Sequence, residues 1–364
     1  MGRILSARTE STVYAQSKLR LDSLTPNVTV TGQGTDFTLA DGKPVDIRVL
    51  RLKNATCFAY SDVVLLDNGQ CLFDLKEIPH IQPYCRFAHE ALIQDTDNWC
   101  QIKPWKKSEH LAKAIKIGGM FGFNYYHLLF QLLPRMFETA VVERGIPLLL
   151  DKRVAEIPNM KQLVEWCNLE SRDIVYMDTD VAYSVDELYV INSGNICIPN
   201  LKPGYSLYEP KAVYSPNSIQ QLSRTLLPYR VQKSTPERVF ISRRKATGLR
   251  TCNEDELYQV LKPLGFEEVF PEELSVAEQI SVFHQAKMIA SSEGAALSNL
   301  LFIQPGCKVI VFYCMPGLTS EFGSLVLMNG GELIELYDIP DGDLHLASYQ
   351  RNYHIDPAKL QALL

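Results

Sequence analysis

The sequence predicts an α/β protein of two domains with a β-rich lead-in at its N-terminal end. At 364 residues the chain exceeds what one hydrophobic core usually supports, which favours two domains. Hydrophobic residues make up 46% of the chain and charged residues 21%, values typical of a folded protein. After residue 216, short apolar runs alternate with helical patterns, which indicates strands connected by helices.

The N-terminal half shows first a strand pattern and then a helical one. Residues 37–75 alternate apolar and polar positions around an Asp-Asn-Gly turn, so we expect short antiparallel strands joined by hairpins. A long apolar pattern at residues 124–143 predicts a helix that is interrupted by Pro134. Gly145 ends this pattern, and residues 146–150 are expected to form a buried strand.

The C-terminal half is predicted to be a Rossmann-like domain. A stretch rich in proline and tyrosine, residues 199–216, separates the halves, so we divide the chain into domains at 1–205 and 206–340 and a tail with a helix at 341–364. Strands are expected at residues 239–242, 266–270, 287–291, 308–313 and 332–338. Helices are expected at residues 253–264, 275–286, 295–302 and 319–328, the second with a capping box of Ser275 and Glu278. Single helices between strands require crossovers, so the sheet should be parallel and covered on both faces.

Composition excludes several classes of function. A net charge of −6 offers no general basic field, so nucleic acid is not an expected partner. The nine cysteines include no CxxC pair, which argues against a zinc cluster or a disulfide framework and favours a reducing compartment. Polar residues follow the first five positions, and no stretch approaches the ~20 apolar residues of a membrane span. We therefore expect a cytoplasmic protein, with peripheral membrane contact left open.

The loop after the first strand of the C-terminal domain is basic. Parallel sheets bind ligands at the carboxyl ends of their strands, so this loop is a candidate site. It contains Arg243, Arg244, Lys245 and Arg250. Guanidinium groups give paired donors to phosphate oxygens, which suits a diphosphate. The alternative is a solvated basic loop without a ligand.

The loop that follows residue 291 carries small and polar residues. Gly294 and Ala295 stand at the expected start of a helix, whose free backbone N–H groups attract an anion. Glu293 precedes that helix and is a candidate acceptor for ribose hydroxyls, while Ser298 and Asn299 offer further polar contacts. The alternative is tight packing between helix and strand, which needs small residues regardless of ligand.

In the N-terminal half, polar residues open the apolar helix. Asn124, Tyr125, Tyr126 and His127 follow the glycine-rich segment 118–122, which indicates a loop beside a polar helix start. With a reference pKa near 6.5, the imidazole is a candidate base for an acceptor hydroxyl. The alternative is a structural histidine at a helix start.

Two acidic strings raise the question of a metal. Asp178 with Asp180, and Asp341 with Asp343, have the DxD spacing that can grip a divalent cation on a diphosphate. Such short strings are common in solvated turns, and we favour that interpretation. No metal or other cofactor is therefore expected.

Several of these motifs, taken together, resemble glycosyltransferase family 61. They are residues 124–127 with Leu132-Leu133-Pro134-Arg135, then 241–244, then Glu278-Gln279, then 293–297 with Asn299 and Phe302. The resemblance is to bacterial-type members associated with capsular polysaccharide. It implies a GT-B architecture of two Rossmann-like domains facing a cleft, and an inverting, metal-independent transfer from a nucleotide sugar, UDP-linked in our expectation, to a glycan or lipid-linked glycan. The domain 1–205 would then bind the acceptor, with Arg135 on that side, and 206–340 the donor.

Two positions depart from the family's usual pattern. Glu293 stands where histidine is common, and Gln131 stands where an acidic residue is frequent. If that acid served as base, Glu138 is the nearest carboxylate downstream and becomes a second catalytic candidate beside His127. These departures also leave open a non-catalytic sugar- or nucleotide-binding module with a decayed transferase site. A Rossmann-type oxidoreductase or hydrolase is disfavoured, because GxGxxG and GxSxG motifs are missing.

Overall fold

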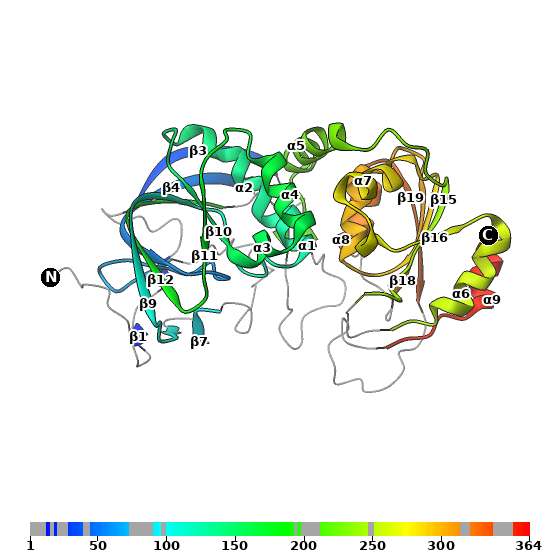
Figure 1. Cartoon of the computed structure of the whole chain (residues 1–364), viewed down its shortest axis with the longest axis horizontal. Coiled ribbons are helices and arrows are strands. Elements are labelled where there is room, and N and C mark those ends of the chain that lie inside the picture. The colour runs from blue at the N-terminus through cyan, green and yellow to red at the C-terminus, as the bar shows by residue number, and fades with distance from the viewer. Residues whose placement is uncertain are drawn as a thin grey trace. The chain divides into compact units, whose positions relative to one another are not determined.

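The chain divides into two compact units (Figure 1). Unit 1 comprises Met1–Tyr205 and Val213–Leu222, and unit 2 comprises Ser206–Ala212 and Ser223–Leu364. The structure, a computed structural model, describes residues 12–14, 18–19, 28–38, 44–72, 90–95, 100–192, 195–197, 212–246, 251–313, 321–337 and 352–364. Arg250 and the string at 341–343 therefore lie outside the described residues.

Unit 1 is built on a mixed sheet of nine strands. Its order is β11-β10-β9-β12-β4-β5-β6-β2, with β3 paired to β4. The first four are parallel, and β3, β4, β5 and β6 join antiparallel. Their bounds are β2 Lys18–Leu19, β3 Val28–Thr38, β4 Pro44–Cys57, β5 Val64–Leu65, β6 Cys71–Leu72, β9 Lys107–Lys116, β10 Leu148–Asp151, β11 Ile174–Met177 and β12 Val181–Ile191. The predicted hairpins are confirmed, but the sheet is not the all-parallel one of a Rossmann-like domain, because β12 pairs antiparallel with β4.

Shorter strands and helices complete unit 1. Short strands are β1 Thr12–Tyr14, β7 Leu92–Asp95 and β8 Cys100–Ile102, which form a small sheet, and β13 Ile196–Cys197 and β14 Ala212–Val213 near the boundary of the units in the sequence. Helices are α1 Tyr125–His127, α2 Leu133–Phe137, α3 Lys152–Glu156, α4 Pro158–Cys167 and, across the boundary, α5 Pro216–Leu226. The 3-10 turn Glu138–Val141 follows α2.

The predicted interruption at Pro134 takes the form of a π-helical turn, Leu128–Leu132, between α1 and α2. Proline has no N–H group, so it cannot donate to the carbonyl oxygen of Phe130 as a helix requires. The side-chain amide of Asn195 donates to that oxygen instead, at 2.8 Å. A widened turn and a distant side chain thus let the apolar helix continue through the proline.

Unit 2 is a five-stranded parallel sheet of order β16-β15-β17-β18-β19, so the prediction of a parallel sheet is confirmed. The strands are β15 Arg238–Ile241, β16 Glu267–Val269, β17 Met288–Ser292, β18 Lys308–Tyr313 and β19 Glu332–Tyr337. The helices are α6 Glu254–Leu261, α7 Val276–Gln285, α8 Glu321–Met328 and α9 Pro357–Leu363, with 3-10 segments Leu227–Tyr229, Lys262–Leu264, Pro271–Glu273 and Ala295–Phe302. The predicted helix at 295–302 is present, but as a 3-10 helix.

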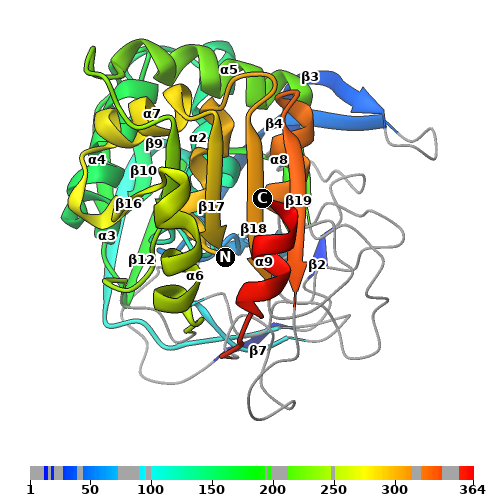
Figure 2. The same ribbon diagram turned by 90° about the vertical axis from the view of Figure 1, so that its right-hand side faces the viewer.

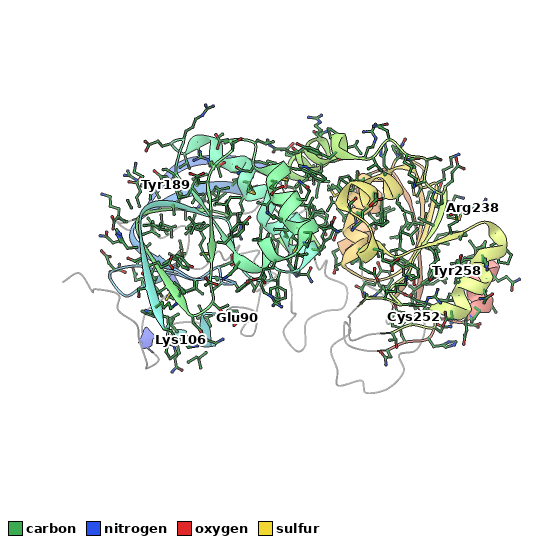
Figure 3. All side chains as sticks on the ribbon, in the orientation of Figure 1. Glu90, Lys106, Tyr189, Arg238, Cys252 and Tyr258 are labelled. Carbon is green, nitrogen blue, oxygen red and sulfur yellow. The ribbon has the colours of Figure 1, made fainter. Side chains whose placement is uncertain are left out.

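Helices cover both faces of the unit 2 sheet. Figures 1 and 2 show α6 and α9 on one face and α7 and α8 on the other. Tyr258 projects from α6 (Figure 3). On this face its ring stacks on Phe240 of β15, with centroids 5.6 Å apart. Ile355 and Leu360 from the end of the chain enter the same core. Residues 352–364 therefore pack as part of unit 2.

The cap predicted from the sequence is found in α7, where Ser275 and Glu278 form the expected capping box. Asn253 stands at the N-cap position of α6, but its side chain does not cap the backbone N–H groups of the helix. It exchanges hydrogen bonds with the backbone of Ile355 at 2.9 Å instead. The strand order turns back between β15 and β17, and doubly wound sheets bind ligands beyond the carboxyl ends of the strands at such a point.

No helix in the described part of the chain has the length and apolar character needed to cross a membrane.

Candidate functional site

The carboxyl ends of β15 and β17 bring the two predicted loops of unit 2 together. Ile241 pairs with Ser291 in the parallel register, so the residues that follow them are neighbours. The guanidinium of Arg243 donates a hydrogen bond of 2.5 Å to the carbonyl oxygen of Glu293. An added Cβ at Gly294 would overlap Nη1 of Arg243, so glycine is needed for this close approach. The expected proximity of the two loops is confirmed.

A buried carboxylate that the sequence reasoning missed holds this edge in place. Glu254, the first residue of α6, is 4% exposed. Its Oε2 accepts hydrogen bonds from the hydroxyl of Ser242 at 2.9 Å and from the backbone N–H of Arg243 at 2.8 Å. Its Oε1 accepts from the hydroxyl of Ser292 at 2.7 Å. One carboxylate therefore connects the start of α6 to the ends of β15 and β17. The sequence signal that could have identified it is an acidic residue at the first position of the helix after the basic loop.

The other described cations of the basic loop are engaged by carboxylates. Arg244 pairs with Asp255 and Glu268. Lys245 pairs with Glu273 at 2.6 Å, and its ammonium lies 4.0 Å from the centroid of a phenylalanine ring. The charges of Arg244 and Lys245 are therefore compensated within the protein. Arg243, by contrast, donates a hydrogen bond to the backbone carbonyl of Glu293, directly after β17.

The predicted polar contacts of the second loop lie mostly in the core. Asn299 is fully buried, and its amide donates to the side-chain oxygen of Gln279 at 2.9 Å. Ser298 is likewise fully buried, whereas Ala295 is partly exposed. Glu293 is 8% exposed and donates its N–H to the carbonyl of β18 at Phe312. The side chains of Ser298 and Asn299 thus belong to the core, where no solvent reaches them.

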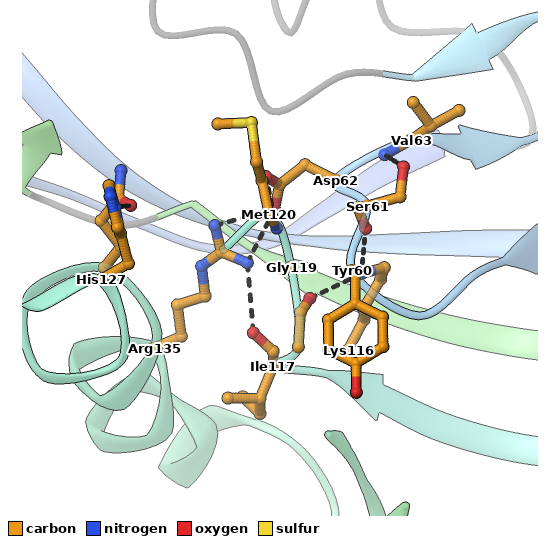
Figure 4. A network of polar contacts seen from close by, with 12 residues as sticks. Tyr60, Ser61, Asp62, Val63, Lys116, Ile117, Gly119, Met120, His127 and Arg135 are labelled. Carbon is orange, nitrogen blue, oxygen red and sulfur yellow. Dashed lines mark hydrogen bonds and ion pairs between the residues drawn. The ribbon is translucent and has the colours of Figure 1, made fainter. Parts of the chain in front are cut away.

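The glycine-rich segment of unit 1 follows β9 and contacts two carboxylates, Asp62, which Figure 4 shows, and Asp151 at the end of β10. Asp151 is fully buried and accepts hydrogen bonds from the N–H groups of Tyr60 at 2.6 Å and Gly119 at 3.0 Å. Burial raises the pKa of Asp151 to about 6, against the lowering effect of the nearby Lys116 ammonium. That ammonium donates to the carbonyls of Ser61 and Gly118, both at 2.6 Å.

Asp62 is the second carboxylate of this network. It accepts hydrogen bonds from both terminal nitrogens of Arg135, at 3.2 and 3.1 Å, and from the N–H of Met120 at 3.2 Å. An added Cβ at Gly119 would overlap its carboxylate. Arg135, expected on the acceptor side, is only 6% exposed and serves this contact. The backbone N–H groups of Gly119 and Met120 therefore already donate to the protein's own carboxylates.

His127 is the predicted base, and its ring is held on two sides. Its Nδ1 lies 2.5 Å from the amide oxygen of Gln131. An amide oxygen only accepts, so Nδ1 carries the proton and Nε2 keeps its lone pair. The Phe121 ring stacks on the imidazole with centroids 4.9 Å apart. Burial lowers the pKa of His127 to about 4, so the ring is neutral at pH 7.

The described residues leave Nε2 of His127 without a hydrogen-bond partner. Gln131 thus orients the imidazole of His127, as the acidic residue frequent at this position in the family could otherwise do. Glu138 lies about three turns further along the helix, roughly 16 Å from His127 along its axis, and the structure does not bring these two candidates together.

The remaining residues of the helix start have local roles. The side chain of Asn124 caps the helix by accepting from the N–H of Tyr126 at 2.9 Å and of His127 at 3.5 Å. The Tyr126 hydroxyl is buried and bonds to that of Tyr214 at 2.6 Å. Tyr125 is partly exposed. Of the residues expected to face an acceptor, Asn124, Tyr125 and His127 are partly exposed, whereas Tyr126 and Arg135 are buried.

The described acidic string sits in a salt-bridged turn. Asp178 pairs with Lys152 and Asp180 with Lys106, both at 2.7 Å, and all four side chains are about half exposed or more. No cluster of three or more histidine, cysteine or acidic side chains suited to a metal occurs among the described residues.

Comparison with known proteins identifies one family. The model of the family described as Glycosyltransferase 61 matches residues 125–310, which is 186 of 364 residues. The matched stretch runs from the helix start at Tyr125 to β18 and contains the candidate region of unit 2. In unit 1 it contains Tyr125–Arg135 and Asp151, but not Asp62, Lys116, Asn124 or the glycine-rich segment. A comparison with curated proteins finds no match.

Proposed function

The chain belongs to glycosyltransferase family 61, and from that premise we propose that it moves a sugar from a nucleotide-sugar donor to a glycan acceptor, with inversion and without a metal. A GT-B arrangement, in which donor and acceptor sites belong to different domains, is part of this proposal. We further propose that the donor is UDP-linked and that the acceptor is a lipid-linked or free glycan. The protein would act in capsule-type polysaccharide synthesis in the cytoplasm.

The contact of Arg243 with Glu293 is the observation that supports a donor site in unit 2. It holds a guanidinium at the turning point of a parallel sheet, where doubly wound folds bind phosphates. Gly294 leaves room for this guanidinium, because an added Cβ would overlap Nη1 of Arg243. At the corresponding edge of unit 1, the N–H groups of Met120 and Gly119 already donate to Asp62 and Asp151.

The state of His127 supports its role as general base. Transfer with inversion forms a bond between the acceptor oxygen and the anomeric carbon while the bond from that carbon to the diphosphate breaks. The proton of the acceptor hydroxyl must go to a base, and Nε2 of the neutral His127 is able to take it. Arg243 stabilises the negative charge that develops on the leaving diphosphate, so this step needs no metal.

Donor calorimetry and transfer kinetics on matched variants test this function. Arg243→Ala should weaken nucleotide-sugar binding roughly 10- to 150-fold, because a charge-assisted hydrogen bond is lost. Lys245→Ala is the control, since Glu273 already compensates its charge, and should bind as wild type. His127→Gln should bind donor normally and transfer about 10²- to 10⁴-fold more slowly. Donor binding without transfer would favour the non-catalytic module; failure of every nucleotide sugar to bind would overturn the proposal.

A further inference from the structure

Asp62 connects the helix that carries His127 to the loop that packs on its ring. The residue lies between β4 and β5, 63 positions before Tyr125, where the matched region starts. Two donors from Arg135, on the same run of helix as His127, reach one carboxylate oxygen, and the N–H of Met120 reaches the other. Side-chain exposure is 7% for Arg135 and 14% for Asp62, so the pair is largely shielded from water.

The loop conformation depends on this carboxylate. Phe121 has a φ of +58°, a left-handed conformation that is strained for a bulky residue and persists only when its surroundings hold it. Asp62 holds the two preceding residues: its oxygen binds the N–H of Met120, and its carboxylate fills the space above Gly119. The Phe121 ring is thereby placed on the imidazole of His127.

Asp62 also acts on His127 through its charge. Burial disfavours the imidazolium, and Gln131 brings a hydrogen bond but no charge. The negative charge of Asp62 works against burial and raises the pKa of His127. Arg135 is the cation that pairs with Asp62, and its positive charge neutralises part of the negative charge of this carboxylate. The charge of Asp151, the other carboxylate of the network, is offset by the ammonium of Lys116.

We propose that Asp62 is the positioning residue of the His127 base: it holds the loop that seats Phe121 on the imidazole, and it supplies the counter-charge when Nε2 takes up the acceptor's proton. The proposal rests on the function proposed above, in which His127 is the base. In this scheme Asp62 acts as a charged hydrogen-bond acceptor toward Arg135 and Met120, and the proton of the acceptor hydroxyl goes to His127.

Steady-state transfer kinetics on isosteric variants test the role. Asp62→Asn keeps the size of the side chain and removes its charge, and should lower kcat about 10- to 100-fold while the donor KM changes less than about twofold. Asp62→Glu restores the charge and should recover part of the lost kcat. Asp67→Asn, an exposed aspartate five positions later in the same hairpin region, is the control and should behave as wild type. Wild-type kcat in Asp62→Asn overturns the proposal.

An NMR titration of the His127 ring gives a readout that a merely structural role would not move. Its pKa should fall in Asp62→Asn and rise in Arg135→Gln, because the first change removes the favourable charge and the second removes the opposing one. If Asp62→Asn does not fold, an unchanged His127 pKa in Arg135→Gln still overturns the proposal. If His127→Gln transfers sugar at the wild-type rate, His127 is not the base and the proposed function is refuted. If His127→Gln is slow but Asp62→Asn transfers at the wild-type rate, only the role of Asp62 is refuted.

Discussion

The carboxylate of Glu254 accepts a hydrogen bond of 2.7 Å from the hydroxyl of Ser292, 38 residues further along the chain. Its other oxygen receives the backbone N–H of Arg243, so the start of α6 clamps the ends of β15 and β17 together. A buried carboxylate is costly unless hydrogen bonds compensate it, and these donors do so. The clamp positions the backbone from which the Arg243 side chain extends.

Glu254→Gln should therefore destabilise the fold and weaken donor binding together. An amide group accepts through one oxygen only, so either Ser292 or the Arg243 N–H loses its acceptor, at a cost of about 1 to 3 kcal/mol. Urea unfolding and donor calorimetry measure the two effects. Asp255→Asn, at the exposed neighbouring position, is the control and should change stability by less than about 0.5 kcal/mol. Unaltered stability in Glu254→Gln would refute the clamp.

Gly294→Ala should weaken donor binding without a large loss of stability. The backbone at Gly294 is extended, with φ of 177°, so alanine is not strained there. Its Cβ would meet the flexible end of Arg243 and push the guanidinium away. We expect donor affinity to fall on the order of 10-fold, and no further fall when Gly294→Ala is added to Arg243→Ala. Additive losses in the double variant would show that the glycine acts independently of the arginine.

The rate of transfer should stay nearly constant as the pH falls from 8 to 5. A base works in its unprotonated form, and burial lowers the pKa of His127 to about 4, so activity is lost only as the pH approaches 4. Gln131→Glu places a carboxylate beside Nδ1, which favours the imidazolium and raises this pKa. The acid limb of the kcat/KM profile should then move upward by about one pH unit. An acid limb that stays in place would separate His127 from the chemistry.

Transfer should also survive chelation of divalent metals. In the described acidic string, Asp178 and Asp180 are paired with Lys152 and Lys106, so neither carboxylate is presented for a cation. We expect full activity in EDTA and in Asp178→Ala, measured as initial rates. Activity that disappears in EDTA and returns with manganese would contradict the metal-independent mechanism.

Local sequence patterns were enough to predict the secondary structure of unit 2. Apolar runs and caps identified β15 to β19 and the capping box of Ser275 and Glu278, because these features depend on residues a few positions apart. The meeting of Arg243 with Gly294 followed from topology, since parallel strands end at one edge of a sheet. Unit 1 was predicted less well, because its parallel strands continue into an antiparallel sheet through the pairing of β12 with β4.

The sequence by itself determined the family, the order of strands along the chain and which loops carry cations and a histidine. Only the tertiary structure decided which of these groups remain available. Arg244 and Lys245 are compensated by carboxylates that lie 11 to 28 residues away. Asp62 reaches Arg135 across 73 residues, and Asp151 reaches Tyr60 across 91. Hydrogen bonds and ion pairs depend on distance in space, which neighbouring sequence positions do not encode, so these networks appear only once the chain is folded.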